Sequence, residues 1–158
     1  MLEQILYALA LTSVTVTCHA AGSVYLVIPA TGVWKPAKTS SAASRPVWTL
    51  IRLVSLLLVL HLLEMSVWAA AYAAGGVLPD FETAFYFSMT SYSTLGFGDV
   101  IPPVSWRLLG PIEAVVGVLM LGWSTSIIVA VVQRMYNSRL PNAPGATDRG
   151  ATPLAPGE

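Results

Sequence analysis

The sequence has few charged residues, and this shortage excludes an ordinary soluble protein. Of its 158 residues, 10% are Asp, Glu, Lys or Arg, whereas 55% are hydrophobic. Soluble domains usually carry about 25% charged residues. With a mean hydropathy of +0.69, the composition indicates a chain whose solvent is lipid.

Other absences exclude further classes of function. Cys18 is the single cysteine, so an intrachain disulfide and a Cys-x-x-Cys zinc or redox motif are excluded. Eight basic residues balance eight acidic ones, which leaves no basic surplus for binding nucleic acid. The chain has no internal repeat. Its length predicts a single domain, with no room for a separate soluble ligand-sensing domain.

Three apolar segments are long enough to cross a bilayer as helices, which takes about 20 residues. They span residues 5–28, 47–74 and 108–132. Between the first two lies a polar linker that contains several prolines and serines. Residues 136–158 are rich in proline and glycine and lack apolar periodicity, so we expect a disordered tail. The predicted fold class is an all-α membrane protein.

The charges predict how the chain is oriented in the membrane. Basic residues lie in or beside the linker and after the last apolar segment: Lys35, Lys38, Arg45, Arg52, Arg134, Arg139 and Arg149. Basic loops tend to stay cytoplasmic. Three spans then place the N-terminus outside and the C-terminus in the cytoplasm. A cleaved signal peptide is the alternative for the first segment, but this segment lacks a positive start and exceeds a typical apolar core, so we expect a retained helix.

The segment between the second and third spans carries the functional signal. Asp80 is a candidate N-cap for a helix, and the apolar, aromatic stretch that follows to Ser93 is too short to cross a bilayer. A glycine-containing loop, residues 94–99, comes next. Non-helical backbone at membrane depth is tolerated only inside protein or along a water-filled path. The pattern therefore predicts a re-entrant loop, because a plain surface turn does not explain the half-length helix.

The residue types in this loop suit an ion filter. Rings of backbone carbonyl oxygens can replace the hydration shell of a potassium ion. Gly96 and Gly98 can adopt the positive φ that turns successive carbonyls the same way. The side chains of Leu95 and Phe97 would then point away from the ions, and Thr94 would add its hydroxyl at the inner end. The C-terminal end of the short helix, which is partly negative, would face the cation's path.

The run Thr94-Leu95-Gly96-Phe97-Gly98-Asp99 resembles the potassium-channel signature Thr-Val-Gly-Tyr-Gly-Asp. The resemblance covers about residues 47–132 and is to small bacterial ion channels of the helix–pore loop–helix type, here with an extra N-terminal transmembrane helix. It implies a homotetramer that binds K+ at Thr94, Leu95, Gly96 and Phe97, with Asp99 at the outer mouth. Leu95 and Phe97 depart from the signature, and phenylalanine lacks the hydroxyl that often braces the filter.

The predicted organisation has four parts. Residues 1–30 form an N-terminal transmembrane helix, residues 31–46 a cytoplasmic linker, residues 47–135 the pore domain and residues 136–158 the tail. The pore domain divides into an outer helix, a pore helix, a filter and an inner helix, over residues 47–74, 80–93, 94–99 and 108–135. The predicted function is passive conduction of potassium across the cell membrane. No enzyme activity and no cofactor are expected, and the expected partners are K+, the lipid bilayer and further copies of the chain.

Buried polar residues leave alternatives open. Glu113 lies about one turn inside the third span, where a carboxylate is a candidate functional group. It could support the filter helix through Ser88 or Thr90, take part in gating, or be protonated. His61 and Glu64 share a helix face at i, i+3. With His19 they form either an interhelical polar contact or a metal site.

The remaining alternatives concern the third span and the function itself. Gly117 and Gly122 permit close helix packing or a gating hinge. A membrane-embedded metal or haem protein would use His19, His61, Glu64 and Glu113. A weakly selective cation channel and a non-conducting membrane scaffold would keep the same fold. The first span lacks a ladder of arginines, so a conventional voltage sensor is not expected.

Overall fold

The computed structural model describes residues 2–27, 29 and 46–137, and this part of the chain is helical, without strands. The helices are α1 (Leu2–Gly22), η1, a π-helix (Ser23–Val27), α3 (Pro46–Ala74), α4 (Phe81–Tyr92), η3, a 3-10 turn (Val104–Trp106), and α5 (Leu109–Asn137). Nearly all of the predicted linker and tail, with most of the basic residues that predict orientation, lies outside the described residues. The predicted all-α fold is confirmed.

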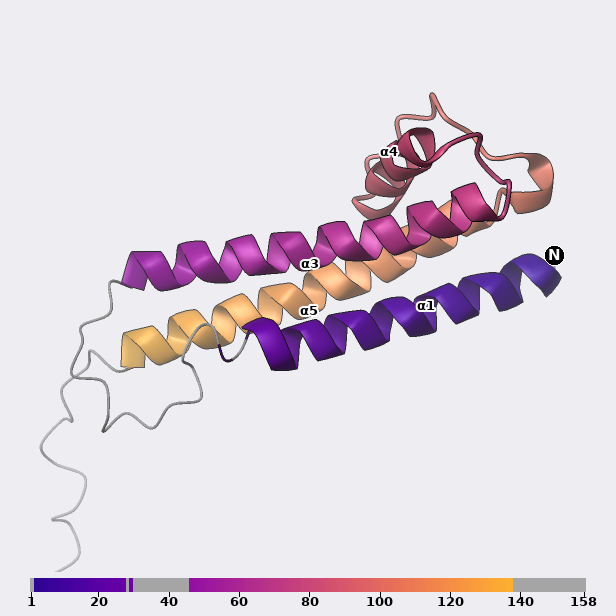
Figure 1. Ribbon diagram of the computed structural model, residues 1–158. Helices are drawn as coiled ribbons and strands as arrows, with labels where there is room; N and C mark the ends of the chain where they lie inside the picture. The colour runs from indigo at the N-terminus through magenta and orange to yellow at the C-terminus, as the bar shows by residue number, and fades with distance from the viewer. Residues whose placement is uncertain (1, 28, 30–45, 138–158) are drawn as a thin grey trace, which may run out of the picture.

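The three long helices lie side by side, and the short helix α4 lies at one end of them (Figure 1). α1 contacts both α3 and α5, and α4 packs between the end of α3 and the start of α5. The N-terminus of α1 lies at the same end as α4 (Figure 1). α1 and α5 therefore run in one direction and α3 runs in the other.

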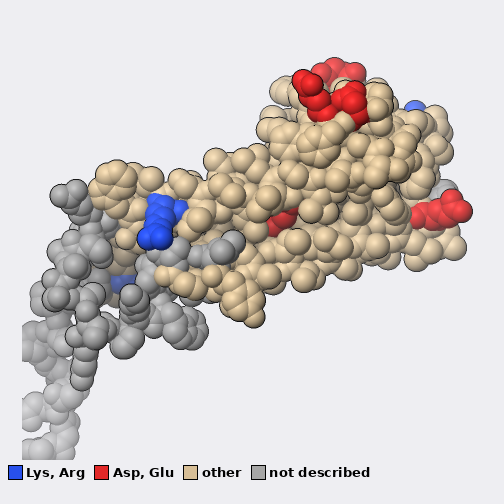
Figure 2. Space-filling view, in the orientation of Figure 1, with Lys and Arg blue, Asp and Glu red and all other residues tan. Residues whose placement is uncertain are grey.

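Three helical segments are long and apolar enough to cross a membrane. They are Leu2–Tyr25, Val47–Ala74 and Val104–Asn137, with mean hydropathies of 1.5, 2.0 and 2.3. Figure 2 shows acidic side chains gathered at the end that carries α4, while the long body beyond them is mostly uncharged, with one acidic patch partway along it. Many apolar side chains on the long helices are exposed, among them Leu58, Leu63, Val115 and Leu119. Exposed apolar surface of this extent requires lipid or another protein to cover it.

The core of the molecule lies between α4 and the two helices that hold it. Trp68 and Tyr72 of α3, Phe87 and Tyr92 of α4, and Met120 of α5 belong to one buried cluster. The rings of Tyr72 and Phe87 meet edge to face with centroids 5.3 Å apart. This packing fixes the position of α4 relative to the long helices, and with it the loop that follows α4.

Candidate functional site

The turn between α3 and α4 fixes where α4 begins. Gly76 takes a positive φ of 64°, which breaks away from the helical path of α3. The side chain of Asp80 then accepts a hydrogen bond of 2.8 Å from the backbone N–H of Thr83, so the predicted N-cap is confirmed. This hydrogen bond lowers the pKa of Asp80 below its ordinary value, because it stabilises the carboxylate.

α4 is a half-length helix. Its 12 residues span about 18 Å at the usual rise of 1.5 Å per residue, whereas the hydrocarbon core of a bilayer is about 30 Å thick. Its last turn carries the loop: the N–H of Thr94 donates to the carbonyl of Ser91 at 2.9 Å, and that of Gly96 donates to the carbonyl of Thr90 at 3.1 Å. The loop therefore starts at a defined place and direction.

The loop after α4 has an alternating backbone. Thr94, Gly96 and Gly98 have φ values of 62°, 57° and 77°. Thr94 is the one non-glycine residue with positive φ in the described part of the chain. A β-branched residue in this region is strained, and such strain is concentrated at functional sites. Positive φ at every second residue permits neighbouring carbonyls to point toward one side of the loop.

Two apolar side chains of the loop are not covered by the described part of the chain. Leu95 is 61% exposed and Phe97 is 67% exposed. At the end of the loop, the hydroxyl of Tyr86 on α4 donates to Asp99 at 2.7 Å. This contact lowers the pKa of Asp99 and raises that of Tyr86, because it stabilises the carboxylate while the phenol keeps its proton. Tyr86 thus braces the loop through Asp99, a contact that the sequence analysis missed.

The end of α4 that leads into the loop is held by α5. A Cβ atom added at Gly117 would lie 2.1 Å from the carbonyl oxygen of Tyr92, the last residue of α4. Glycine is thus what permits backbone contact between α5 and the end of α4. A Cβ atom at Gly122 meets nothing within 4 Å. Of the two glycines considered for packing or hinging, Gly117 is the one that makes a close helix contact in the described part of the chain.

Glu113 is enclosed between α3 and α4. The side chain is fully buried, and the hydroxyl of Tyr72 donates to it at 2.6 Å. The oxygen of Ser88 lies within hydrogen-bond distance of both Glu113 and the carbonyl of Met65. One hydroxyl has one proton, so Ser88 serves both neighbours only if Glu113 is a carboxylic acid that donates to it. The structure therefore pairs Glu113 with Ser88 and not with Thr90, whose hydroxyl donates to Phe87.

A second cluster of buried polar side chains, which we call the polar ring, connects α1, α3, α4 and α5. Its members are His19 of α1, His61 and Glu64 of α3, Tyr92 of α4 and Ser124 of α5. Nδ1 of His19 lies 2.8 Å from Glu64, and Nδ1 of His61 lies 3.0 Å from the hydroxyl of Tyr92. Tyr92 in turn donates to Glu64. Nε2 of His61 and of His19 lie 2.9 Å and 3.5 Å from Ser124.

The polar ring gathers three of the four residues considered as metal ligands. The ligand atoms of His19, His61 and Glu64 lie within 4.8 Å of one another, while Glu113 is bonded elsewhere. Sequence reasoning did not place Tyr92 or Ser124 in this group. The only signal for Tyr92 was a phenol at the end of an apolar helix, which needs a hydrogen-bond partner when buried. Thr125 and Ser126, by contrast, donate to carbonyls of their own helix.

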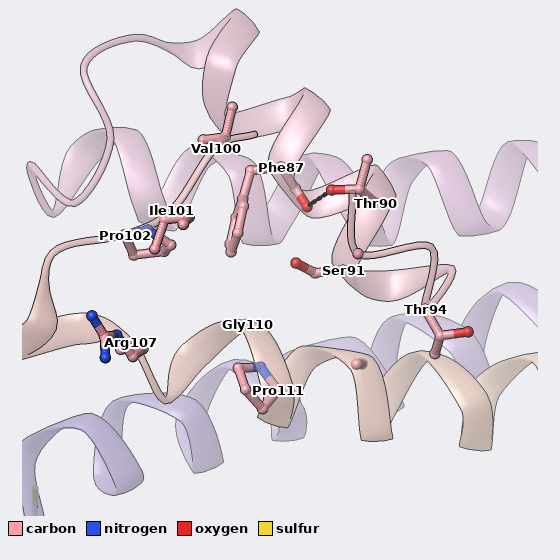
Figure 3. Close-up of a pocket in the computed structure, with 12 residues that line it drawn as sticks. Phe87, Thr90, Ser91, Thr94, Val100, Ile101, Pro102, Arg107, Gly110 and Pro111 are labelled. Atoms are coloured by element: carbon pink, nitrogen blue, oxygen red, sulfur yellow. Dashed lines mark hydrogen bonds between the residues drawn. The ribbon is translucent and has the colours of Figure 1, made fainter. Parts of the chain in front are cut away.

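A cavity of about 360 Å³ lies beside the loop. Figure 3 shows Phe87 of α4, Ile101 and Pro102 of the returning loop, and Pro111 of α5 around it. A Cβ atom at Gly110 would lie 2.9 Å from the ring of Phe87, so this glycine admits the aromatic side chain. Thr94 and Gly96 also line the cavity, so one side of the loop faces open space.

Comparisons with known proteins place this geometry in a family. The family described as "Ion channel" matches residues 56–134, which is 79 of the 158 residues and includes α4, the loop and most of α3 and α5. A curated relative, the voltage-gated potassium channel Kch of Escherichia coli (strain K12), is 32% identical over 103 residues. That alignment covers 62% of this chain and 23% of the relative, so the chain spans about a quarter of the relative's length. No solved structure matches.

The family match covers the half-length helix, the loop with alternating backbone and the helices on either side of it. With three apolar helices, it identifies a multi-pass membrane protein and points to a channel rather than an enzyme. The chain belongs to the ion channel family.

Proposed function

We propose that the protein is a subunit of a homotetrameric, potassium-selective channel, with residues 94–98 as its filter. The observation that carries the proposal is the alternating backbone of the loop, with positive φ at Thr94, Gly96 and Gly98, directly after a helix too short to cross a bilayer. The matching relative is itself named a potassium channel. Backbone carbonyls, with the hydroxyl of Thr94 at the inner end, would be the groups that the ions meet.

Four copies of the chain would account for surfaces that one protomer leaves open. Leu95 and Phe97 are largely exposed, although a loop at membrane depth must be buried in protein or line an aqueous path. Around a fourfold axis, the carbonyls of residues 94–97 would face the axis and these two side chains would pack on neighbouring subunits. Each ring of four carbonyls would then replace part of the water around K+.

Charge near the loop favours a cation at both ends. The C-terminal end of α4 carries partial negative charge and leads directly into Thr94. Asp99 at the other end is exposed and is kept ionised by the hydrogen bond from Tyr86. An anionic ring concentrates cations at a pore mouth. We assign the Asp99 end to the outside, which places the N-terminus of α1 outside as well, since both lie at the same end of the molecule (Figure 1).

The test is ion flux through purified protein in liposomes, with K+ and Na+ compared and Ba²⁺ as a blocker. Gly96→Ala should abolish K+ flux, because alanine at a φ of 57° is strained. Relief of that strain would turn the neighbouring carbonyls away from the positions that ion binding needs. Gly76→Ala is the matched control. Its φ is 64° and its Cβ also meets nothing within 4 Å, but it lies in the turn before α4.

Each outcome of this test separates the candidate functions. Equal K+ and Na+ flux would identify a weakly selective cation channel. Absence of flux from a correctly assembled tetramer would identify a scaffold. Unchanged selective flux in Gly96→Ala would refute the assignment of the filter. The number of copies is measured by native mass spectrometry, where a species other than four chains would refute the tetramer.

A further inference from the structure

The polar ring contains ionisable side chains that have no part in the proposed conduction path. Its five side chains are buried, with exposed fractions of 0% for Glu64 and Tyr92 and 6% for His61. A carboxylate buried at membrane depth needs a compensating positive charge. Both ion pairs of Glu64 in the described part of the chain are with histidines. The protons in the ring therefore decide whether its charge is balanced.

Hydrogen-bond donors can be counted from one side of the ring. A phenol is a weaker acid than a carboxylic acid by several pH units, so Tyr92 keeps its proton and donates it to Glu64. The oxygen of Tyr92 can then only accept from His61, which requires a proton on Nδ1 of that histidine. Nδ1 of His19 likewise donates to the other oxygen of Glu64.

The other side of the ring has one hydroxyl for two nitrogens. Nε2 of His61 and Nε2 of His19 both face Ser124. If both histidines are neutral, both nitrogens are acceptors, and the single hydroxyl proton of Ser124 satisfies only one of them. One added proton on either Nε2 removes the conflict. Ser124 then accepts from the protonated nitrogen and donates to the other.

We infer that the polar ring is a proton-binding site that holds one excess proton on its histidine pair, His19 and His61, against the carboxylate of Glu64. With that proton, every hydrogen bond in the ring has one donor and one acceptor, and the net charge is zero. Imidazole is ordinarily more basic than a carboxylate by about 2 pH units, which places the proton on a histidine. Ser124 links the two sites that share it.

A divalent metal ion fits the same residues less well. Bonds of about 2.0–2.1 Å in a tetrahedral zinc site separate the ligand atoms by roughly 3.3 Å. Nδ1 of His19 lies 2.8 Å from Glu64, and Tyr92 is closer still to the same carboxylate, as hydrogen bonds require. One carboxylate would also leave a divalent ion with an uncompensated charge, whereas a proton is balanced.

The groups that can influence this proton come from every helix around it. α1 contributes His19, α3 contributes His61 and Glu64, and α4 contributes Tyr92. α5 contributes Ser124, which is neutral. The carboxyl group of Glu113, also on α5, is hydrogen-bonded to Tyr72 and Ser88 instead of to the ring. The excess proton is therefore the positive partner that the ring supplies to Glu64.

The proton site would control conduction through Tyr92, and this part of the inference rests on the proposed function. Tyr92 is two residues before Thr94, and its carbonyl contacts Gly117 of α5. Loss of the proton would leave Glu64 without a positive partner and break the ring at Ser124. The last turn of α4 would then be held less firmly, so K+ flux would fall by about fivefold or more on alkalinisation.

Nitrogen NMR of histidine tests the proton directly, because the chain has two histidines in all. With 15N-histidine in the full-length protein in liposomes at pH 7, we expect one imidazolium and one neutral ring protonated on Nδ1. On raising the pH, the imidazolium signal should disappear. Two neutral rings at pH 7, or a signal from a metal-bound nitrogen that a chelator removes, would overturn the proton site.

Variants and flux separate this inference from the channel proposal. Glu64→Gln removes the anion, so both histidines should be neutral at pH 7. Ser66→Ala is the control on the same helix, since Ser66 donates to Leu62 outside the ring, and it should keep the imidazolium. If Glu64→Gln does not fold, the pH titration of the unaltered protein decides.

An imidazolium without K+ flux at any pH refutes the channel and leaves the proton site standing. Flux unchanged after the proton is lost refutes the coupling.

Discussion

Replacing Gly117 by alanine tests how closely α5 and α4 are joined beneath the loop. The added Cβ would lie 2.1 Å from the oxygen, 2.9 Å from the carbonyl carbon and 3.0 Å from Cγ of Tyr92. Ordinary contacts begin at 3.4 Å, so the two helices must separate by about 1.3 Å along that contact. Because the nearest atoms are backbone, no side-chain rotation relieves the clash.

The cost of this overpacking is about 1–3 kcal/mol, and we expect the upper part of that range because the clash is with backbone. Alanine also gains up to about 1 kcal/mol over glycine within a helix. Gly122→Ala provides that gain without a clash, since its Cβ meets nothing within 4 Å. The difference in unfolding free energy between the two variants isolates the overpacking.

The assay is SDS-induced unfolding in mixed micelles, followed by circular dichroism. Gly117→Ala should unfold at a lower SDS fraction than Gly122→Ala, by the equivalent of about 2–3 kcal/mol. If the two variants agree within about 0.5 kcal/mol, the distinguishing limit for independent sites, then α5 does not contact the carbonyl of Tyr92. Displacement of Tyr92 should also lower K+ flux, because this residue lies two positions before Thr94.

Two further variants test the neighbouring contacts. Tyr86→Phe removes the hydrogen bond that lowers the pKa of Asp99, so that pKa should return toward its ordinary value of 3.8. Because a lowered carboxylate pKa keeps the charge until the pH falls through it, K+ flux of the variant should decline at a higher pH on acidification. An identical acid profile would contradict the brace. Glu113→Gln should change stability by less than about 1 kcal/mol, because an amide also donates to Ser88 and accepts from Tyr72. Glu113→Ala should cost more, about 1–3 kcal/mol, because the hydroxyl of Tyr72 loses its acceptor while Ser88 keeps the carbonyl of Met65. Equal losses in SDS unfolding would show that Glu113 is ionised.

The long helices could be predicted from the sequence, because the signal is local. A run of about 20 apolar residues has few alternatives to a membrane-crossing helix. The structure has α3 and α5 within two residues of the predicted ranges 47–74 and 108–135. The cap at Asp80 was also readable, because it depends on residues that are three positions apart.

The polar contacts could be predicted only in part. The i, i+3 spacing of His61 and Glu64 follows from helix geometry, and a link to His19 was one of several possibilities. Tyr92 and Ser124 join from 31 and 63 residues away from His61. No local pattern encodes a contact over such distances, because it depends on how four helices rotate against one another.

The sequence by itself determined the membrane-crossing helices, the half-length helix and the glycine-bearing loop, because hydrophobic run length, capping and backbone freedom are properties of neighbouring residues. Tertiary packing decided the rest: which hydroxyl pairs with Glu113, that Gly117 meets the end of α4, and that Tyr92 bonds His61 and Glu64. Those contacts depend on how the helices rotate and how closely they pack. A buried carboxyl group or a missing Cβ constrains this rotation and spacing only once the helices are in contact.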